Sequence, residues 1–307
     1  MTIDRTTITL CLGFAAIFCV GLLRPSQPQG SWDRSHPKRF WAQKLEWERQ
    51  FDIVFAGDSR VVFGIAPEVA TETMGGARAA NFGFLGGGYS AAYLEALEGT
   101  LDPASPAPIL VLGFSPRSIV PTLTWLNEFT EARDLGLCDR LTQRYFSELL
   151  WNHRRLDLVQ LEDWFRGSSE FEEVIYNFRD DGWIETQVVD TERLSRTDRM
   201  NPITEPVDPY PPTMIEAVMD HVERWSSAGI RVFGYRSPTP GRRARNEDEL
   251  YRFDEPFFVA SFERSGGTWL ELPGDEYTFW DSSHMDDESA RAFTAEVMRA
   301  MRTTSRP

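Results

Sequence analysis

Cysteine and histidine are both scarce in this chain of 307 residues, which excludes several kinds of site. Of its three cysteines, Cys11 and Cys19 lie in an apolar N-terminal stretch, so Cys138 has no partner for a disulfide in the rest of the chain. No C-x-x-C spacing suggests zinc, and we expect neither a metal nor a cofactor. Histidine-dependent chemistry has only four candidates: His36, His153, His221 and His284.

Positive charge is also in short supply. The net charge is −15, which argues against nucleic acid as a partner, since binding to phosphates needs a basic surface. The hydrophobic fraction of 41% and the charged fraction of 26% are ordinary for a globular protein. The length suits one large domain or two small ones, with enough chain for a sizeable core.

Residues 6–23, "TTITLCLGFAAIFCVGLL", carry no charge at all. Eighteen apolar positions are just enough for a helix to span a bilayer, and they are long for the core of a signal peptide. We therefore expect an uncleaved signal anchor over residues 1–23. A cleaved signal peptide and a buried core helix are the alternatives.

The rest of the chain predicts an α/β domain over residues 51–305, after a linker and lead-in helix over residues 24–50, with the helix at 40–50. Apolar runs predict five strands, at 51–58, 77–84, 108–115, 230–238 and 267–273. Periodic segments predict helices at 90–101, 213–229 and 286–301. Strands that alternate with helices indicate a parallel sheet. Residues 119–212 do not fit this alternation, and we interpret them as a helical insertion.

Residues that can do acyl chemistry follow the first strand and precede the last helix. Ser59 ends the "FDIVFAGDS" run, while Asp281 and His284 stand three apart in "WDSSH". In parallel sheets, ligands bind beyond the carboxyl ends of the strands, so these side chains are expected to meet there. Ser59 would then be the nucleophile, His284 the general base, and Asp281 the group that orients its ring. The alternatives are a polar turn and an ordinary helix cap.

These motifs resemble those of the SGNH (GDSL-like) hydrolase superfamily. Gly-Asp-Ser at 57–59 matches its first block, which holds the nucleophile, and Asp-x-x-His at 281–284 matches its last block. Residues 81–86 are similar to its second block, with Gly86 at the position of the oxyanion glycine. The resemblance extends over about 50–300, apart from the insertion. It implies a three-layer, flavodoxin-like parallel sheet.

The third block departs from the superfamily pattern. Gly-Phe-Ser-Pro at 113–116 stands in place of Gly-x-Asn-Asp, so Ser115 falls where the oxyanion asparagine would be. The resemblance thus implies an oxyanion hole formed by the N–H groups of Ser59 and Gly86, with the Ser115 hydroxyl as a further donor. Loss of one oxyanion donor typically costs roughly 10²–10³ in rate. A slower transferase or a divergent site therefore remains an alternative to efficient hydrolysis.

Three more residues near these blocks are predicted to bind substrate. Asn81 lies in the second block, and the alternative for it is an ordinary turn residue. Arg60 and Arg117 follow the first and third blocks, where a guanidinium can bind a carboxylate or phosphate. For both arginines the alternative is a solvated or ion-paired side chain.

A tethered domain with "GDSR" at 57–60 and no third-block asparagine is similar to the envelope-associated branch of the superfamily. This branch includes the alginate O-acetylation and lipoteichoic-acid D-alanylation proteins. The likeness implies an extracytoplasmic, membrane-anchored esterase or O-acyltransferase that acts on a cell-envelope glycan or acylated polymer, beside a membrane-bound acyltransferase. A catalytically silent glycan-binding or scaffold protein is the alternative. A cytoplasmic lipase is a further one, because more positive charge follows the apolar segment than precedes it.

Overall fold

The structure is a computed structural model that describes most of the predicted α/β domain. The described residues are 35–119, 127–142, 174–188, 212–274, 276–281 and 283–304. The predicted signal anchor at residues 1–23 and much of the predicted insertion lie outside these ranges. Within them, no helix combines the length and hydropathy that crossing a bilayer requires.

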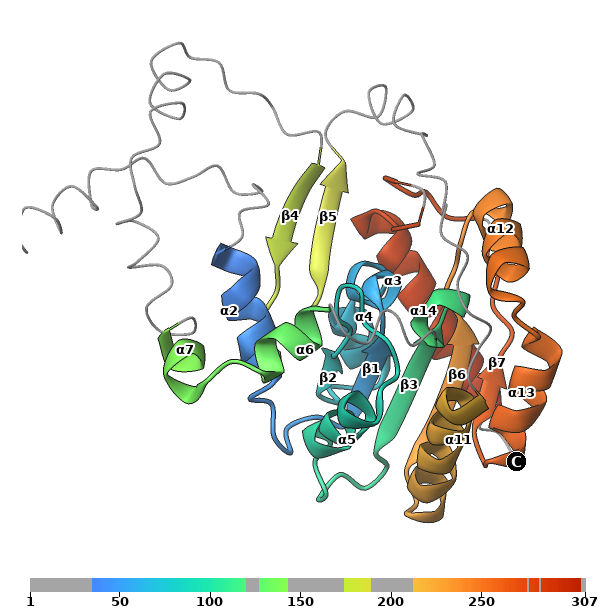
Figure 1. Cartoon of the computed structure of the whole chain (residues 1–307), viewed down its shortest axis with the longest axis horizontal. Helices are drawn as coiled ribbons and strands as arrows, with labels where there is room; N and C mark the ends of the chain where they lie inside the picture. Colours follow the sequence, from blue (N-terminus) through green and yellow to red (C-terminus); the bar gives the residue numbers. More distant parts are fainter. Residues whose placement is uncertain are drawn as a thin grey trace, which may run out of the picture.

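A five-stranded parallel sheet forms the centre of the molecule (Figure 1). Its strands in chain order are β1 (Ile53–Gly57), β2 (Ala79–Asn81), β3 (Ile109–Phe114), β6 (Arg231–Arg236) and β7 (Thr268–Leu270). The spatial order is β2-β1-β3-β6-β7, the flavodoxin-like arrangement of an open parallel sheet. The predicted α/β class and all five strand positions are confirmed. In such sheets, the carboxyl ends of the two strands where the order reverses, here β1 and β3, form the usual binding crevice.

Helices cover both faces of the sheet, which explains why its strands are apolar throughout. One face packs against α5 (Ala91–Thr100), α11 (Pro212–Ser227) and α13 (Glu255–Arg264). The other packs against α4 (Pro67–Thr73) and α14 (Asp287–Thr304). Buried apolar side chains from β1 and β3 fill both cores. The strand ends are therefore fixed by packing on two sides.

The lead-in helix α2 spans Ser35–Lys44, so the predicted position of 40–50 is wrong by about one and a half turns at each end. The chain leaves the helix after Lys44 and passes through Arg49, whose φ of +52° is not helical. Trp47 beyond this helix packs edge-on against Phe51 at 5.0 Å. Trp47 is thus buried outside the helix, where the prediction had placed it inside.

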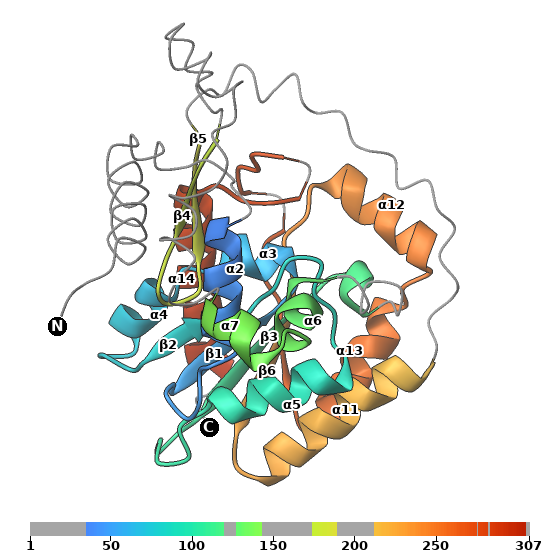
Figure 2. The ribbon, with the colours of Figure 1, turned by 60° about the vertical axis from the view of Figure 1, so that its left-hand side comes forward.

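The insertion is not simply helical. Two short helices, α6 (Glu128–Arg133) and α7 (Leu137–Leu141), are followed by an antiparallel hairpin of β4 (Val174–Phe178) and β5 (Ile184–Val188). The sequence did not predict this hairpin, which lies beside α2 and α14 (Figure 2). Its place is next to the carboxyl ends of the main strands.

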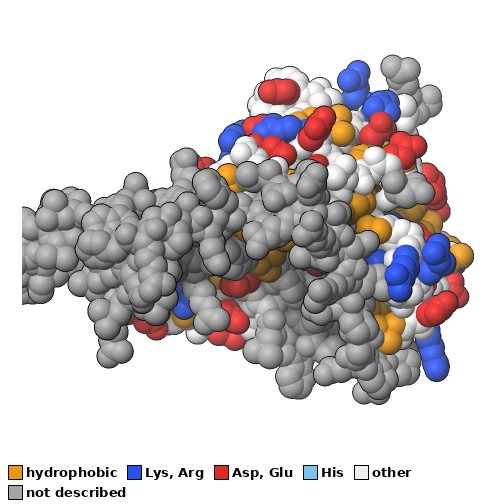
Figure 3. Space-filling model, turned by 90° about the horizontal axis from the view of Figure 1, so that it is seen from above, with side chains coloured by type: hydrophobic (Ala, Val, Ile, Leu, Met, Phe, Trp, Pro, Cys, Tyr) orange, Lys and Arg blue, Asp and Glu red, His pale blue; other side chains and the backbone are white. Residues whose placement is uncertain are grey.

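Charge on the face seen from above is mixed. Among the side chains coloured in Figure 3, acidic and basic groups are interspersed around patches of apolar surface. Although the whole chain has a net charge of −15, this face does not show a single continuous acidic patch among its coloured side chains.

Candidate active site

A sharp turn at the end of β1 presents Ser59 as the first residue of helix α3 (Ser59–Gly64). Asp58 caps the helix, because its Oδ1 accepts the N–H of Arg60 at 2.9 Å. Gly57 is required before it: its φ is +155°, and a Cβ there would lie 2.6 Å from the carbonyl oxygen of Gly113. The turn thus depends on the Gly-Asp pair and directs the serine away from the strand.

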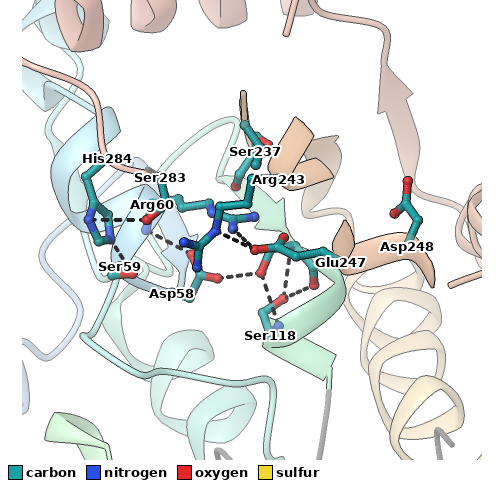
Figure 4. Close-up of polar contacts among 12 residues, drawn as sticks. Asp58, Ser59, Arg60, Ser118, Ser237, Arg243, Glu247, Asp248, Ser283 and His284 are labelled. Atoms are coloured by element: carbon teal, nitrogen blue, oxygen red, sulfur yellow. Dashed lines mark hydrogen bonds and ion pairs between the residues drawn. The ribbon is translucent and has the colours of Figure 1, made fainter. Parts of the chain in front are cut away.

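The structure brings Ser59, His284 and Asp281 into one hydrogen-bonded chain. Figure 4 shows the part of it that joins Ser59 to His284. The Oγ of Ser59 lies 2.8 Å from Nε2 of His284, and Nδ1 of the same ring lies 2.7 Å from Oδ2 of Asp281. An ionised carboxylate can only accept, so Nδ1 carries the ring proton and Nε2 is left to accept the Ser59 hydroxyl proton. This is the arrangement a serine nucleophile requires.

The Asp281 carboxylate is held ionised by its surroundings. Burial alone would raise its pKa, but the hydrogen bond and charge of His284 outweigh burial and lower the pKa below its ordinary value. The other oxygen, Oδ1, accepts the N–H groups of Ser283 at 2.6 Å and His284 at 2.7 Å. These bonds fold the loop around the carboxylate and fix the direction of the acceptor.

The loop after β2 passes the end of β1 and carries Gly86, with a φ of +62° that favours glycine. Backbone bonds hold the loop to the strand, because the N–H of Phe84 donates to the carbonyl of Gly57 at 3.1 Å. The buried amine of Lys44 also donates to the carbonyl of Gly83 at 2.7 Å. Neither the N–H of Ser59 nor that of Gly86 has an acceptor among the described residues. Their predicted role as oxyanion donors stays a prediction.

Ser115 is not placed as an oxyanion donor. Its hydroxyl donates to Oδ2 of Asp58 at 2.5 Å, and its oxygen accepts the N–H of Ser118 at 3.1 Å. A serine hydroxyl has one proton to donate, and here it is donated in the hydrogen bond to Asp58. The predicted third donor is therefore corrected: Ser115 supports the helix cap that precedes the nucleophile.

Asn81 is fully buried and supports α3 instead of facing a ligand. Its amide nitrogen donates to the carbonyls of Val61 at 2.7 Å and Ile65 at 2.9 Å, while its Oδ1 accepts the N–H of Gly83 at 3.0 Å. The Val61 carbonyl also accepts the N–H of Ile65 at 3.2 Å, so Asn81 adds a side-chain contact at the C-terminal turn of α3. The predicted substrate-binding role is replaced by a structural one.

Arg60 is also buried, and its predicted substrate-binding role is corrected in the same way. Its guanidinium pairs at 2.5 Å with Glu247 of helix α12 (Gly241–Tyr251), and Arg243 pairs with the same carboxylate at 2.8 Å. Burial opposes both charges, but the two arginines hold the pKa of Glu247 below its usual value, and Glu247 holds the pKa of Arg60 above its own. Arg117 is exposed on the 3-10 turn η1 (Pro116–Ile119), so its predicted role stays a prediction.

Several residues that shape the site were not predicted. Phe63 and Trp280 contact the ring of His284, and Tyr176 of the hairpin contacts both of them. Trp280 directly precedes the Asp-x-x-His motif, and this position in the sequence could have indicated that it lies near His284. Glu247 stands among other acids in "NEDE", so nothing in the sequence distinguishes it. Among the described residues, no group of three His, Cys, Asp or Glu side chains is arranged to hold a metal ion.

Comparison with known proteins gives little further guidance. No protein-family model matches the chain, and no curated protein matches it. One similar solved structure is a "putative acylhydrolase" from Bacteroides fragilis. It is 13% identical with a TM-score of 0.35, and the match covers 90% of this chain and 100% of that one.

Proposed function

We propose that the chain is a serine-dependent acyl esterase or O-acyltransferase of the SGNH type. The observation that carries this proposal is the hydrogen-bonded chain from Ser59 through His284 to Asp281. The site sits at the carboxyl end of β1, where the strand order reverses and α/β sheets usually bind ligands.

The geometry supports a two-step acyl transfer. Oγ of Ser59 attacks the acyl carbonyl while Nε2 of His284 takes the hydroxyl proton, and Asp281 stabilises the imidazolium that forms. The N–H groups of Ser59 and Gly86 stabilise the oxyanion of the tetrahedral intermediate. His284 then gives its proton to the departing alkoxide, which leaves an acyl-Ser59 ester. Water or a sugar hydroxyl, deprotonated by His284, attacks this ester and releases the serine.

The finer assignment concerns substrate and location. We propose that the acyl group is carried by a cell-envelope glycan or related polymer and that residues 1–23 anchor the domain outside the cytoplasm. The apolar run at 6–23 and the resemblance to the envelope-associated branch support this assignment. A reporter fused to the C-terminus and active only after export would support it. A reporter active only in the cytoplasm would reject it.

The test of the chemistry uses the full chain, a fluorophosphonate probe and p-nitrophenyl acetate. Ser59→Ala and His284→Ala are expected to lower turnover by roughly 10⁴ or more, and Ser59→Ala to abolish labelling. Ser90→Ala and His221→Ala are matched controls, because Ser90 caps α5 and the Nδ1 of His221 contacts the carbonyl of Ala217 in α11. Both controls should retain wild-type rates within a small factor.

A catalytically silent glycan-binding or scaffold protein is the second candidate. It is favoured by one observation: the Ser115 hydroxyl donates its hydrogen bond to Asp58, so the oxyanion would have two backbone donors and no side-chain donor from the third block. A folded wild type that neither labels nor turns over faster than Ser59→Ala would move this candidate to first place.

A further inference from the structure

The ring of His284 is fixed by more than its two hydrogen bonds. These bonds lie in the ring plane, whereas the ring faces contact aromatic side chains. Trp280 stacks at 5.4 Å with an interplanar angle of 24°, and Phe63 lies at 4.7 Å with an angle of 57°. A second polar atom, Oγ of Ser283, lies 3.5 Å from Nδ1 and offers an alternative partner if the ring turns. The stacked ring opposes that rotation.

Trp280 is itself held between the base and the inserted hairpin. Tyr176 on β4 meets it edge-on at 5.6 Å and also contacts Phe63 at 6.2 Å. The N–H of Trp280 donates to the carbonyl of His284 at 3.0 Å, which closes the loop. Its indole Nε1 is buried without a hydrogen-bond partner among the described residues. Ring packing, and not a side-chain hydrogen bond, therefore sets the position of the indole.

The hairpin is anchored on the nucleophile helix as well. The indole N–H of Trp183 donates to the carbonyl of Phe63 in α3 at 2.9 Å. At the hairpin turn, the N–H of Asn81 donates to the carbonyl of Asp181 at 2.8 Å. Gly182 has a φ of +89°, and a Cβ there would lie 2.1 Å from the carbonyl oxygen of Asn81. The hairpin thus touches the elements that carry both Ser59 and His284.

We propose that Trp280 and Tyr176 are positioning residues for His284, so that the inserted hairpin is part of the catalytic apparatus. This inference rests on the proposed function. Trp280 keeps the imidazole in the plane in which Nδ1 faces Asp281 and Nε2 faces Ser59. Tyr176 packs against the indole of Trp280, so the position of the hairpin helps to fix the position of the indole. Displacing a catalytic group by about 1 Å can cost roughly a hundredfold in rate, so a small rotation is enough to matter.

Kinetics of the full chain provide the first test. Trp280→Ala is expected to lower kcat by roughly tenfold to a hundredfold with little change in KM. Trp280→Phe keeps a stacked ring and removes the unpaired donor, so it should recover most of the rate. Tyr176→Ala should lower kcat severalfold. Tyr277→Ala is the matched control, since Tyr277 lies in the same loop but packs on Phe293 at 5.4 Å.

A double-mutant cycle separates positioning from a general structural effect. If Trp280 acts through His284, then Trp280→Ala causes no further loss in a His284→Ala background. An equal loss in both backgrounds would overturn the proposal. So would a wild-type kcat in Trp280→Ala.

Nuclear magnetic resonance of isotope-labelled histidine gives a readout that does not need activity. His284→Ala assigns the signal among the four histidines. The wild type should show one neutral tautomer, protonated at Nδ1, and Trp280→Ala should average the two. If the wild type lacks activity but the tautomer responds, the proposed function fails and the positioning role stands. An unchanged tautomer in Trp280→Ala overturns the positioning role whatever the activity.

Discussion

Two chains of polar contacts leave residues 58–60, and they differ in exposure and charge. The site chain runs from Ser59 through His284 to Asp281. The side chain of His284 is 17% exposed and that of Asp281 is 34% exposed. The support chain runs from Asp58 to Ser115 and from Arg60 to Glu247. The side chains of Arg60 and Glu247 are 5% and 0% exposed. Neighbours in sequence are thus divided between an open chain and a sealed one.

The difference follows from what each chain has to do. A nucleophile and its base must be reached by a substrate and must exchange a proton, so they need access. The support chain holds the turn that presents Ser59, and burial makes its charged hydrogen bonds directional and costly to break. In this turn, Asp58 and Arg60 have structural contacts while Ser59 is the proposed nucleophile, although all three stand in one short motif.

The largest expected effect comes from breaking the support chain at Glu247. Glu247→Ala leaves the buried Arg60 guanidinium without its partner at 2.5 Å. Removal of one member of a buried ion pair typically costs about 3–5 kcal/mol. We expect the free energy of unfolding, measured by urea denaturation, to fall by about that amount.

Glu249→Ala is the matched control for this prediction, because Glu249 is an exposed acid on the same helix. It should change the free energy of unfolding by less than roughly 0.5 kcal/mol. Equal effects of the two variants would mean that Glu247 is solvated, and the distinction between the open and sealed chains would then fail.

An intermediate effect is expected at Ser115, which was predicted to belong to the site but lies in the support chain. Ser115→Ala removes a buried hydrogen bond to the Asp58 carboxylate, which should cost roughly 1–3 kcal/mol of stability. Turnover by the folded protein should change by less than roughly threefold, whereas loss of an oxyanion donor would cost roughly 10²–10³. Urea denaturation and p-nitrophenyl acetate kinetics on the same preparation check both parts. A large rate loss without destabilisation would return Ser115 to the site chain.

Much of the fold could be predicted because its signals are local. Apolar runs such as 51–58 and 108–115 form buried parallel strands, and their alternation with helices gives the α/β class. The meeting of Ser59 with Asp281 and His284 also followed from strand ends and from one short motif. Their catalytic roles stay predictions until the kinetics are measured.

The support chain and the hairpin could not be predicted, because their contacts join distant parts of the sequence. Arg60 pairs with a residue 187 positions away, and no local pattern selects Glu247 from its acidic neighbours. Asn81 was predicted to bind substrate from the second block, yet its partners are carbonyls at the end of α3. Its burial is decided by packing around that helix. In each case the residue type was right for a site, and tertiary packing decided its role.

The smallest expected effect tests whether burial, and not charge alone, makes the support chain costly to break. At the opposite end of β1, Asp52 accepts three hydrogen bonds from Arg78, whose side chain is 52% exposed. The side-chain bond from Arg78 lowers the pKa of Asp52 from 3.8 to about 2. Because the pKa is lower in the folded state, the ionised carboxylate stabilises that state at pH values above the unfolded-state pKa. This stabilisation is lost as the pH falls through the folded-state pKa.

Asp52→Asn should therefore lower the urea midpoint slightly at neutral pH, and the difference from wild type should shrink as the pH falls from about 4 to about 2. Water screens this exposed pair, so the loss at neutral pH should be far smaller than for Glu247→Ala. Urea midpoints of both proteins at several pH values give the comparison. A loss as large as that of Glu247→Ala would mean that charge pairing stabilises this protein equally at its surface and in its core.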